Sequence, residues 1–242
     1  MKIAAWNVNS IKQRQDHVKD WLNENKPDFL LIQELKGVEF PSQVFSGAGY
    51  SSEYVAQKGR NGVAIIAAGD MTVKHDSLPA GTGADSGDKD EQARYLEVEA
   101  NGCRIINIYA PNGNPVDSDK FSYKLNWLDR LYERMKNLLA NDTPFIIGGD
   151  YNIIPEERDC YDPQAWEGDA LYHPDSRARL RKFLNLGMTD AFRVYNGAAQ
   201  SYTFWDYQGG AWPQNNGIRI DHLLLSPRCA DGLKKCWIDK TP

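Results

Sequence analysis

Residues 2–34 read KIAAWNVNSIKQRQDHVKDWLNENKPDFLLIQE and predict a strand, a helix and a second strand in succession. The apolar start, residues 2–7, has the composition of a strand, and Ser10 is placed to cap a helix that runs to about Asn25. A Pro-Asp pair then separates the helix from an apolar run at 29–33, which predicts a buried strand. This β-α-β start is typical of an α/β fold.

The rest of the chain adds short strands and two longer helices. Strands are expected at residues 50–56, 62–67, 95–99, 104–109, 145–148 and 218–225. Apolar residues at three- and four-residue steps predict a helix over residues 118–140, and a second helix is expected near 176–186. A loop rich in Gly and Asp covers residues 80–90. These patterns predict one α/β domain over residues 1–242, a four-layered sandwich in which helices flank two packed mixed β-sheets.

Composition limits the classes of protein to which the chain can belong. Of its 242 residues, 41% are hydrophobic and 25% are charged. No apolar run reaches the roughly 18 residues that a membrane span needs, and the N-terminus lacks the apolar region of a signal peptide. We therefore expect a cytoplasmic monomer without membrane attachment. The formal net charge of -5 argues against a protein that coats nucleic acid by charge alone, but it is compatible with a nuclease whose carboxylates bind metal ions.

Four predicted strands carry metal-competent side chains at their ends: Asn7, Glu34, the pair Asp150 and Asn152, and Asp221. Adjacent strands would bring these ends together, and functional groups gather where strands open into loops. Mg²⁺ prefers oxygen ligands and keeps several waters, so one or two carboxylates with an amide suffice. The pattern therefore predicts a magnesium site, with Mn²⁺ as an alternative metal.

The Gly-Asp-x-Asn motif has both a functional and a structural interpretation. Asp150 and Asn152 are two residues apart, which in extended backbone places both side chains on one face. The preceding Gly148 and Gly149 would leave room for a ligand to approach the backbone closely. The same motif is also typical of an Asx turn after a strand, and this alternative stays open.

The other strand-end residues have structural interpretations too. Glu34 is equally compatible with a solvated strand end, and Asn7 with a cap for the next turn. Tyr109, at the end of another strand, would more often be a half-buried aromatic than a catalytic phenol. The order and spacing of these residues, rather than any one of them, indicate a functional site.

Five motifs carry a resemblance that runs through the whole chain. They are Trp6-Asn7-Val8-Asn9, Gln33-Glu34-Leu35-Lys36, Asn107-Ile108-Tyr109-Ala110-Pro111-Asn112-Gly113, Gly148-Gly149-Asp150-Tyr151-Asn152-Ile153 and Gly217-Ile218-Arg219-Ile220-Asp221-His222. Their succession resembles the exonuclease III family of abasic endonucleases, within the endonuclease/exonuclease/phosphatase superfamily. The resemblance implies a DNase I-like fold and a Mg²⁺-dependent DNA repair phosphodiesterase. Such an enzyme cuts double-stranded DNA 5′ to abasic sites and has 3′ to 5′ exonuclease and 3′-end-cleaning activity.

The resemblance also implies a role for each site residue. The metal ligands would be Asn7, Glu34, Asp150 and Asn152. The catalytic residues would be Tyr109, Asp150, Asn152 and Asp221. Asp150 would orient or deprotonate the attacking water, Asn152 would hold the scissile phosphate, and Tyr109 would help the leaving oxygen. Asp221 would orient a histidine that comes later in the family pattern.

The aromatic segment from Tyr202 to Trp212 resembles the family's pocket for an abasic sugar turned out of the double helix. Phe204 and Trp212 are the residues that we expect in the pocket, whereas core packing explains Tyr202 and Tyr207 better. Further candidates for contacts with DNA are Lys36, Arg94, Asn112 and Arg219. His222 points to the opposite face of its strand from the preceding aspartate, so we expect it to be structural.

The chain departs from the family pattern at its end. Family members continue beyond the position of Pro242 into a Ser-Asp-His segment, which supplies a second aspartate and the active-site histidine, and these 242 residues lack it. The resemblance implies impaired activity if this is the whole chain. Two other functions therefore stay open: a metal-dependent phosphodiesterase of the same fold that acts on a non-DNA substrate, and a DNA-binding form without turnover.

Overall fold

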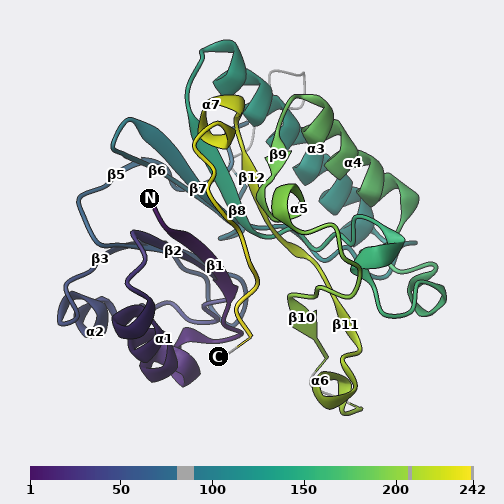
Figure 1. Cartoon of the computed structure of the whole chain (residues 1–242), viewed down its shortest axis with the longest axis horizontal. Helices are drawn as coiled ribbons and strands as arrows, with labels where there is room; N and C mark the ends of the chain where they lie inside the picture. The colour runs from purple at the N-terminus through teal and green to yellow at the C-terminus, as the bar shows by residue number, and fades with distance from the viewer. Residues whose placement is uncertain (81–89, 207–208, 241–242) are drawn as a thin grey trace.

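The computed structural model describes residues 1–80, 90–206 and 209–240. In this part of the chain, two large β-sheets pack face to face and helices cover their outer surfaces (Figure 1). None of the helices described there is both long enough and apolar enough to cross a membrane. Most of the expected loop at 80–90 lies outside the described residues, and so does Tyr207.

The first sheet has the strand order β1-β2-β4-β3. Its strands are β1 Ile3–Asn7, β2 Phe29–Gln33, β3 Ser51–Val55 and β4 Val63–Ala67. β1 and β2 are parallel and are joined by α1 (Ile11–Asn25), which confirms the predicted β-α-β start. Ser10 precedes α1 as expected, but its side chain makes no capping hydrogen bond. α2 (Ser42–Ser46), between β2 and β3, is not evident in the sequence pattern.

The second sheet has the strand order β5-β6-β7-β8-β12-β9. Its strands are β5 Thr72–His75, β6 Tyr95–Ala100, β7 Cys103–Tyr109, β8 Phe145–Asp150, β9 Thr189–Asp190 and β12 Asp221–Leu225. β7 and β8 are parallel, with α3 (Asp119–Ala140) crossing between them, and the other neighbours are antiparallel. The edge strands β5 and β9 are short, and the sequence does not predict them.

The prediction of one continuous strand at 218–225 is wrong, because this segment forms two short strands that belong to different sheets. The first part, β11 (Gly217–Ile218), pairs with β10 (Phe204–Trp205) in a separate small sheet, and β12 then joins the second sheet. Between the two parts, the backbone N–H of Arg219 donates to the carbonyl of Asp159 at 2.8 Å. This bond to the loop after β8 takes the place of a ladder bond. The β10–β11 pair therefore projects from the end of the sheet at which β12 begins (Figure 1).

Apolar side chains fill the spaces between the layers. α3 and α4 (Pro174–Asn185) cover the outer face of the second sheet, where Trp127 is buried, and α1 and α2 cover the first sheet, where Leu22 is buried (Figure 1). Leu31 belongs to the cluster between the sheets. This is the predicted four-layered α/β sandwich. Shorter helical turns are η1 Glu157–Asp159, η2 Gln164–Trp166, α5 Ala191–Tyr195, α6 Ala211–Gln214 and α7 Pro227–Ala230.

The two glycines at the end of β8 are required by the packing of the protein itself. A Cβ atom on Gly148 would lie 2.5 Å from the side chain of Leu223 and 2.6 Å from that of Leu31 in the facing sheet. Gly149 has a φ of 134°, and a Cβ there would lie 2.1 Å from the carbonyl oxygen of Ile108. A side chain at either position would push apart the strands that carry the site.

Candidate active site

The polar ends of β7, β8 and β12 lie side by side in the second sheet. Tyr109 pairs with Asp150 across the parallel strands, and Asp221 pairs with Asp150 across the antiparallel ones. Residues directly opposite one another on neighbouring strands project to the same face of a sheet. The phenol and the two carboxyl groups therefore stand in one row.

The first sheet contributes Asn7 and Glu34 from the ends of β1 and β2. Asn7 Nδ2 donates to Glu34 Oε1 at 2.9 Å and to Asp150 Oδ2 at 3.0 Å, so one amide connects carboxylates of both sheets. Glu34 has a φ of 59°, and its carbonyl accepts a hydrogen bond from Ser10 N at 2.8 Å, which ties it to the start of α1. The structure thus brings these strand ends together as the sequence predicts, while their catalytic roles stay predictions.

Asn152 reaches the site through a turn rather than through extended backbone. Its φ is 49°, and its N–H donates to Asp150 Oδ1 at 2.8 Å. This is the Asx turn that the sequence left open as the alternative interpretation of the Gly-Asp-x-Asn motif. Its side-chain Nδ2 donates to the carbonyl of Ala110 at 2.9 Å. The expectation that Asp150 and Asn152 share one strand face is therefore wrong. Both residues are nevertheless almost fully buried, and the turn joins them through the bond from Asn152 N to the Asp150 carboxylate.

Burial and mutual repulsion raise the proton affinity of the site. Burial raises the pKa of Asp150 to about 6, and the charge of Glu34 adds to this, while hydrogen bonds oppose it. Burial and then the charge of Asp150 raise the pKa of Asp221 well above the usual carboxyl range. Burial, Glu34 and Asp150 likewise raise the pKa of Tyr109. Such a cluster of buried carboxyl groups stabilises either protons or a cation.

Two of the four expected basic and amide contacts for DNA, Lys36 and Arg94, lie beside this cluster. Lys36 Nζ forms an ion pair with Glu34 Oε2 at 3.0 Å. The guanidinium of Arg94 lies 4.8 Å from the centre of the Tyr109 ring and donates to the carbonyl of that residue at 3.1 Å. Asn112 is exposed in the loop that follows β7. Lys36 and Arg94 thus form a basic rim beside Glu34 and Tyr109, whereas the Asn112 side chain accepts a hydrogen bond from Asn114 N within its own loop.

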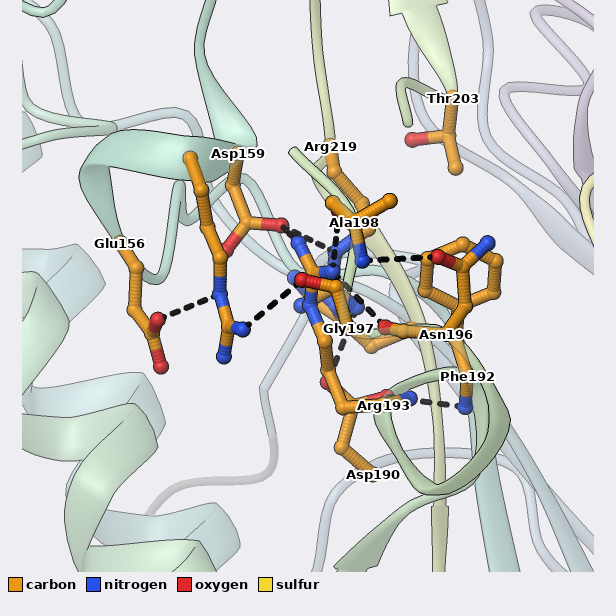
Figure 2. A network of polar contacts seen from close by, with 12 residues as sticks. Glu156, Asp159, Asp190, Phe192, Arg193, Asn196, Gly197, Ala198, Thr203 and Arg219 are labelled. Carbon is orange, nitrogen blue, oxygen red and sulfur yellow. Dashed lines mark hydrogen bonds and ion pairs between the residues drawn. The ribbon is translucent and has the colours of Figure 1, made fainter. Parts of the chain in front are cut away.

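Arg219 is not available for contact with DNA, which corrects the sequence-based expectation. Its side chain is 2% exposed and lies between two carboxylates, with Nε 2.5 Å from Asp159 Oδ1 and Nη1 2.9 Å from Asp190 Oδ2. Arg193 forms a second ion pair with Asp159, and Asp190 also caps α5 (Figure 2). Arg219 instead joins the loop after β8 to α5 and to the start of β12, which carries Asp221.

His222 is structural, as its place on the strand predicts. Its side chain is buried, and Arg219 Nη1 lies 3.0 Å from Nδ1. Since a guanidinium only donates, Nδ1 accepts, and the neutral ring donates from Nε2 to the carbonyl of Ile153 at 3.1 Å. Burial and the charge of Arg219 lower the pKa of His222 to about 4. The folded protein therefore holds this imidazole in its neutral form.

The neutral His222 should make folding weaken as the pH falls. The unfolded chain binds a proton below about pH 6.5, but the folded chain does so only near pH 4, so the unfolded state holds more protons between these values. We expect His222 to reduce the free energy of unfolding by about 2 kcal/mol between pH 7 and pH 5. Urea unfolding of the wild type and of His222→Gln at both pH values measures this contribution. An exposed control, His17→Gln, should keep the wild-type pH dependence; equal pH dependence in all three proteins would contradict the assignment.

The expected pocket aromatics differ in their surroundings. Phe204 packs beside the buried cluster that includes Ile218 and Ile220. Trp212 is 52% exposed and makes an edge contact with Trp205, with ring centres 4.4 Å apart. Both lie on the β10–β11 projection, next to the end of β12 that carries the site. Tyr202 is 1% exposed, so it belongs to the core, as expected.

Sequence reasoning missed two residues that support the site. Lys124 lies in the expected amphipathic helix, but its side chain is fully buried and donates to backbone carbonyls near the site. Its position in an apolar stripe was the only signal. Thr203 Oγ1 accepts hydrogen bonds from the N–H groups of Ile220 and Asp221, each at 3.1 Å. Thr203 thereby shapes the chain where β12 begins, and nothing in the linear sequence indicates this contact.

The donor chemistry of the site fits a hard divalent cation. Glu34 and Asp150 converge on one amide, and Asp221 Oδ1 is buried with no hydrogen-bond partner among the described residues. No group of three or more His, Cys, Asp or Glu side chains within those residues is close enough to hold a metal alone, so amide and water oxygens would complete the shell. Asn7 turns its NH₂ towards the carboxylates and its oxygen accepts from Asn9 N, so binding through oxygen requires rotation of this amide.

Comparison with known proteins decides the family. A model of the Endonuclease/Exonuclease/phosphatase family matches residues 4–239. The chain belongs to this family. Within the family, an AP endonuclease from Archaeoglobus fulgidus is 34% identical and has a TM-score of 0.91, with 100% of this chain and 93% of that chain covered. This agreement confirms the predicted fold class.

Two further family members support the predicted subgroup. A 3′ phosphatase from Neisseria, whose structure contains a product DNA hairpin, is 35% identical with a TM-score of 0.86, and the match covers 96% of this chain and 88% of that chain. Exodeoxyribonuclease III from Haemophilus influenzae is 27% identical over 96% of this chain and 90% of its own length. The resemblance to exonuclease III-type abasic endonucleases is therefore confirmed.

Proposed function

We propose that this chain is a Mg²⁺-dependent DNA repair phosphodiesterase that cuts the backbone 5′ to abasic sites, with 3′ to 5′ exonuclease and 3′-end-cleaning activity. The observation that carries the proposal is the Asn7 amide, which joins Glu34 of one sheet to Asp150 of the other beside Tyr109 and Asp221. Relatives of this subgroup are named as AP endonucleases, exonucleases and a 3′ phosphatase, which supports the same reaction class.

The carboxylates and amides of the site would divide the work of phosphodiester hydrolysis. A bound divalent cation would neutralise the charge that develops on the phosphate oxygens. Glu34, Asp150 and the amides of Asn7 and Asn152 would hold it. Asp150 would accept the proton of the attacking water, because its carboxylate meets Glu34 at the Asn7 amide, where the cation would be held.

Other residues would bind the phosphate and the leaving group. The Asn152 amide would donate to a phosphate oxygen, and Tyr109, whose raised pKa keeps the phenol protonated, would donate to the leaving 3′ oxygen. Asp221 would act from the row beside Asp150 by holding a proton-carrying partner in place. The roles of Asn152 and Tyr109 use groups that the strands bring together, whereas Asp221 Oδ1 has no hydrogen-bond partner among the described residues.

The rim and the aromatic projection would select the DNA substrate. Lys36, Arg94 and Asn112 would contact backbone phosphates on either side of the scissile bond. Phe204 and Trp212 would line a pocket for an abasic sugar that is turned out of the duplex. An intact nucleotide would be too large for this pocket. All of these residues come from one chain, which supports a monomer, and a cytoplasmic location suits a DNA substrate.

The test is incision of a labelled duplex that carries one tetrahydrofuran abasic analogue, with Mg²⁺ or with EDTA. We expect a single cut 5′ to the analogue that requires Mg²⁺, and weaker cutting with Mn²⁺ in place of Mg²⁺ would still support a divalent site. Binding of the abasic duplex without cutting would indicate the DNA-binding form without turnover. Failure to bind any duplex at low salt would instead indicate a non-DNA phosphodiester substrate.

A further inference from the structure

The buried lysine of α3 ends at the backbone of three segments near the site. The Lys124 side chain is fully buried, and its Nζ donates to the carbonyls of Asn152 at 2.6 Å, Asn112 at 2.9 Å and Ala170 at 3.3 Å. An ammonium group has three hydrogens and no acceptor, so these carbonyls use its full capacity. A charge buried in this way is costly unless each hydrogen is bonded, and here each one is.

The chain is shaped to let this side chain pass. Gly113 has a φ of 93°, and a Cβ there would lie 2.6 Å from Lys124 Cδ and 3.2 Å from the Cβ of Ala170. Only glycine tolerates both the backbone angle and the contact. Gly113 and Lys124 therefore form a matched pair that joins the loop after β7 to the turn after β8.

The contact with Asn152 connects this lysine to the proposed chemistry. Asn152 is in the left-handed region, with its N–H bonded to Asp150 and its Nδ2 bonded to the carbonyl of Ala110. Lys124 binds the remaining backbone group, the carbonyl, so the residue is held from three sides. Loss of the ammonium would leave a buried carbonyl unpaired and free the turn to relax.

We infer that Lys124 is a positioning residue, which fixes the turn at Asn152 and the loop at Asn112 so that the Asn152 amide meets the scissile phosphate. This inference rests on the proposed function. Lys124 does not touch the substrate in this arrangement, and it acts through the residue whose backbone it binds. Groups that orient a functional side chain in this manner typically change activity by about 10- to 100-fold when they are removed.

A double-mutant cycle tests the inference. We expect Lys124→Met to lower kcat by about 10- to 100-fold on the abasic duplex, with KM changed less than about threefold. In an Asn152→Ala background the same substitution should have almost no further effect, because it acts through Asn152. The control is Arg134→Met, which removes the ion pair between Arg134 of α3 and the buried Glu97 of β6. The effect of this substitution should add to that of Asn152→Ala.

Amide hydrogen exchange gives a second readout that does not depend on activity. Lys124→Met should increase exchange at residues 112–114 and 152–154 but not at 34–36, whereas Arg134→Met should leave all three segments unchanged. If Lys124→Met does not fold, Lys124→Gln, which keeps donor groups on a shorter side chain, replaces it in both experiments. If the wild type binds no DNA, the proposed function is wrong. The exchange pattern would still test whether Lys124 holds the turn at Asn152 in place. Additive losses in the cycle, or unchanged exchange at 152–154, would overturn the inference.

Discussion

Asp150→Asn should lower the rate of metal-dependent DNA incision by roughly a thousand-fold while the protein stays folded. The substitution keeps the size of the side chain, so the packing at the end of β8 is retained. It removes the group that accepts the proton of water and one of the two carboxylates that meet at Asn7. Single-turnover incision of the tetrahydrofuran duplex at saturating Mg²⁺ measures the loss directly.

The matched control for this experiment is Asp142→Asn, the same chemical change at an exposed position. Its rate should equal that of the wild type, because Asp142 only forms a surface ion pair with Arg228. Circular dichroism of both variants shows whether the fold is retained. An Asp150→Asn protein that cuts at the wild-type rate would remove Asp150 from the mechanism and with it the central step of the proposed function.

Arg219→Met should reduce the free energy of unfolding by about 3 to 5 kcal/mol. The substitution leaves Asp159, whose side chain is fully buried, with a single partner in Arg193, and it leaves Asp190 and His222 without their bond to the guanidinium. Removing one member of a buried ion pair costs more than the pair contributes, because the remaining charge stays out of water. Urea unfolding followed by fluorescence measures the difference.

Arg158→Met is the control on the outside of the same network. Arg158 is 38% exposed and pairs with Glu156, so its loss should cost less than about 1 kcal/mol. Below the unfolding transition, Arg219→Met should still bind abasic DNA, since its side chain does not reach the surface. A large loss of DNA affinity together with unchanged stability would instead support the original expectation that Arg219 contacts DNA.

The sequence by itself determines the layers of the fold and the strand ends that form the site. Hydrophobic periodicity is a local signal, so the β-α-β start and the long helix α3 can be predicted from neighbouring residues alone. Asn7 and Asp150 end their strands, Glu34 follows one and Asp221 begins one. Strands that pair in two facing sheets bring these positions together. The family motifs add an expected chemistry to these positions.

Only the tertiary structure decides which polar side chains face the solvent and which are buried. Arg219 lies between two aspartates from distant segments, and Lys124 ends at carbonyls of three loops, although the sequence around each residue would suit a surface position or an apolar helix face. The same buried arginine breaks the expected strand at 218–225. Burying a charge is favourable only where partners satisfy it, and those partners come from parts of the chain that meet only in the folded protein.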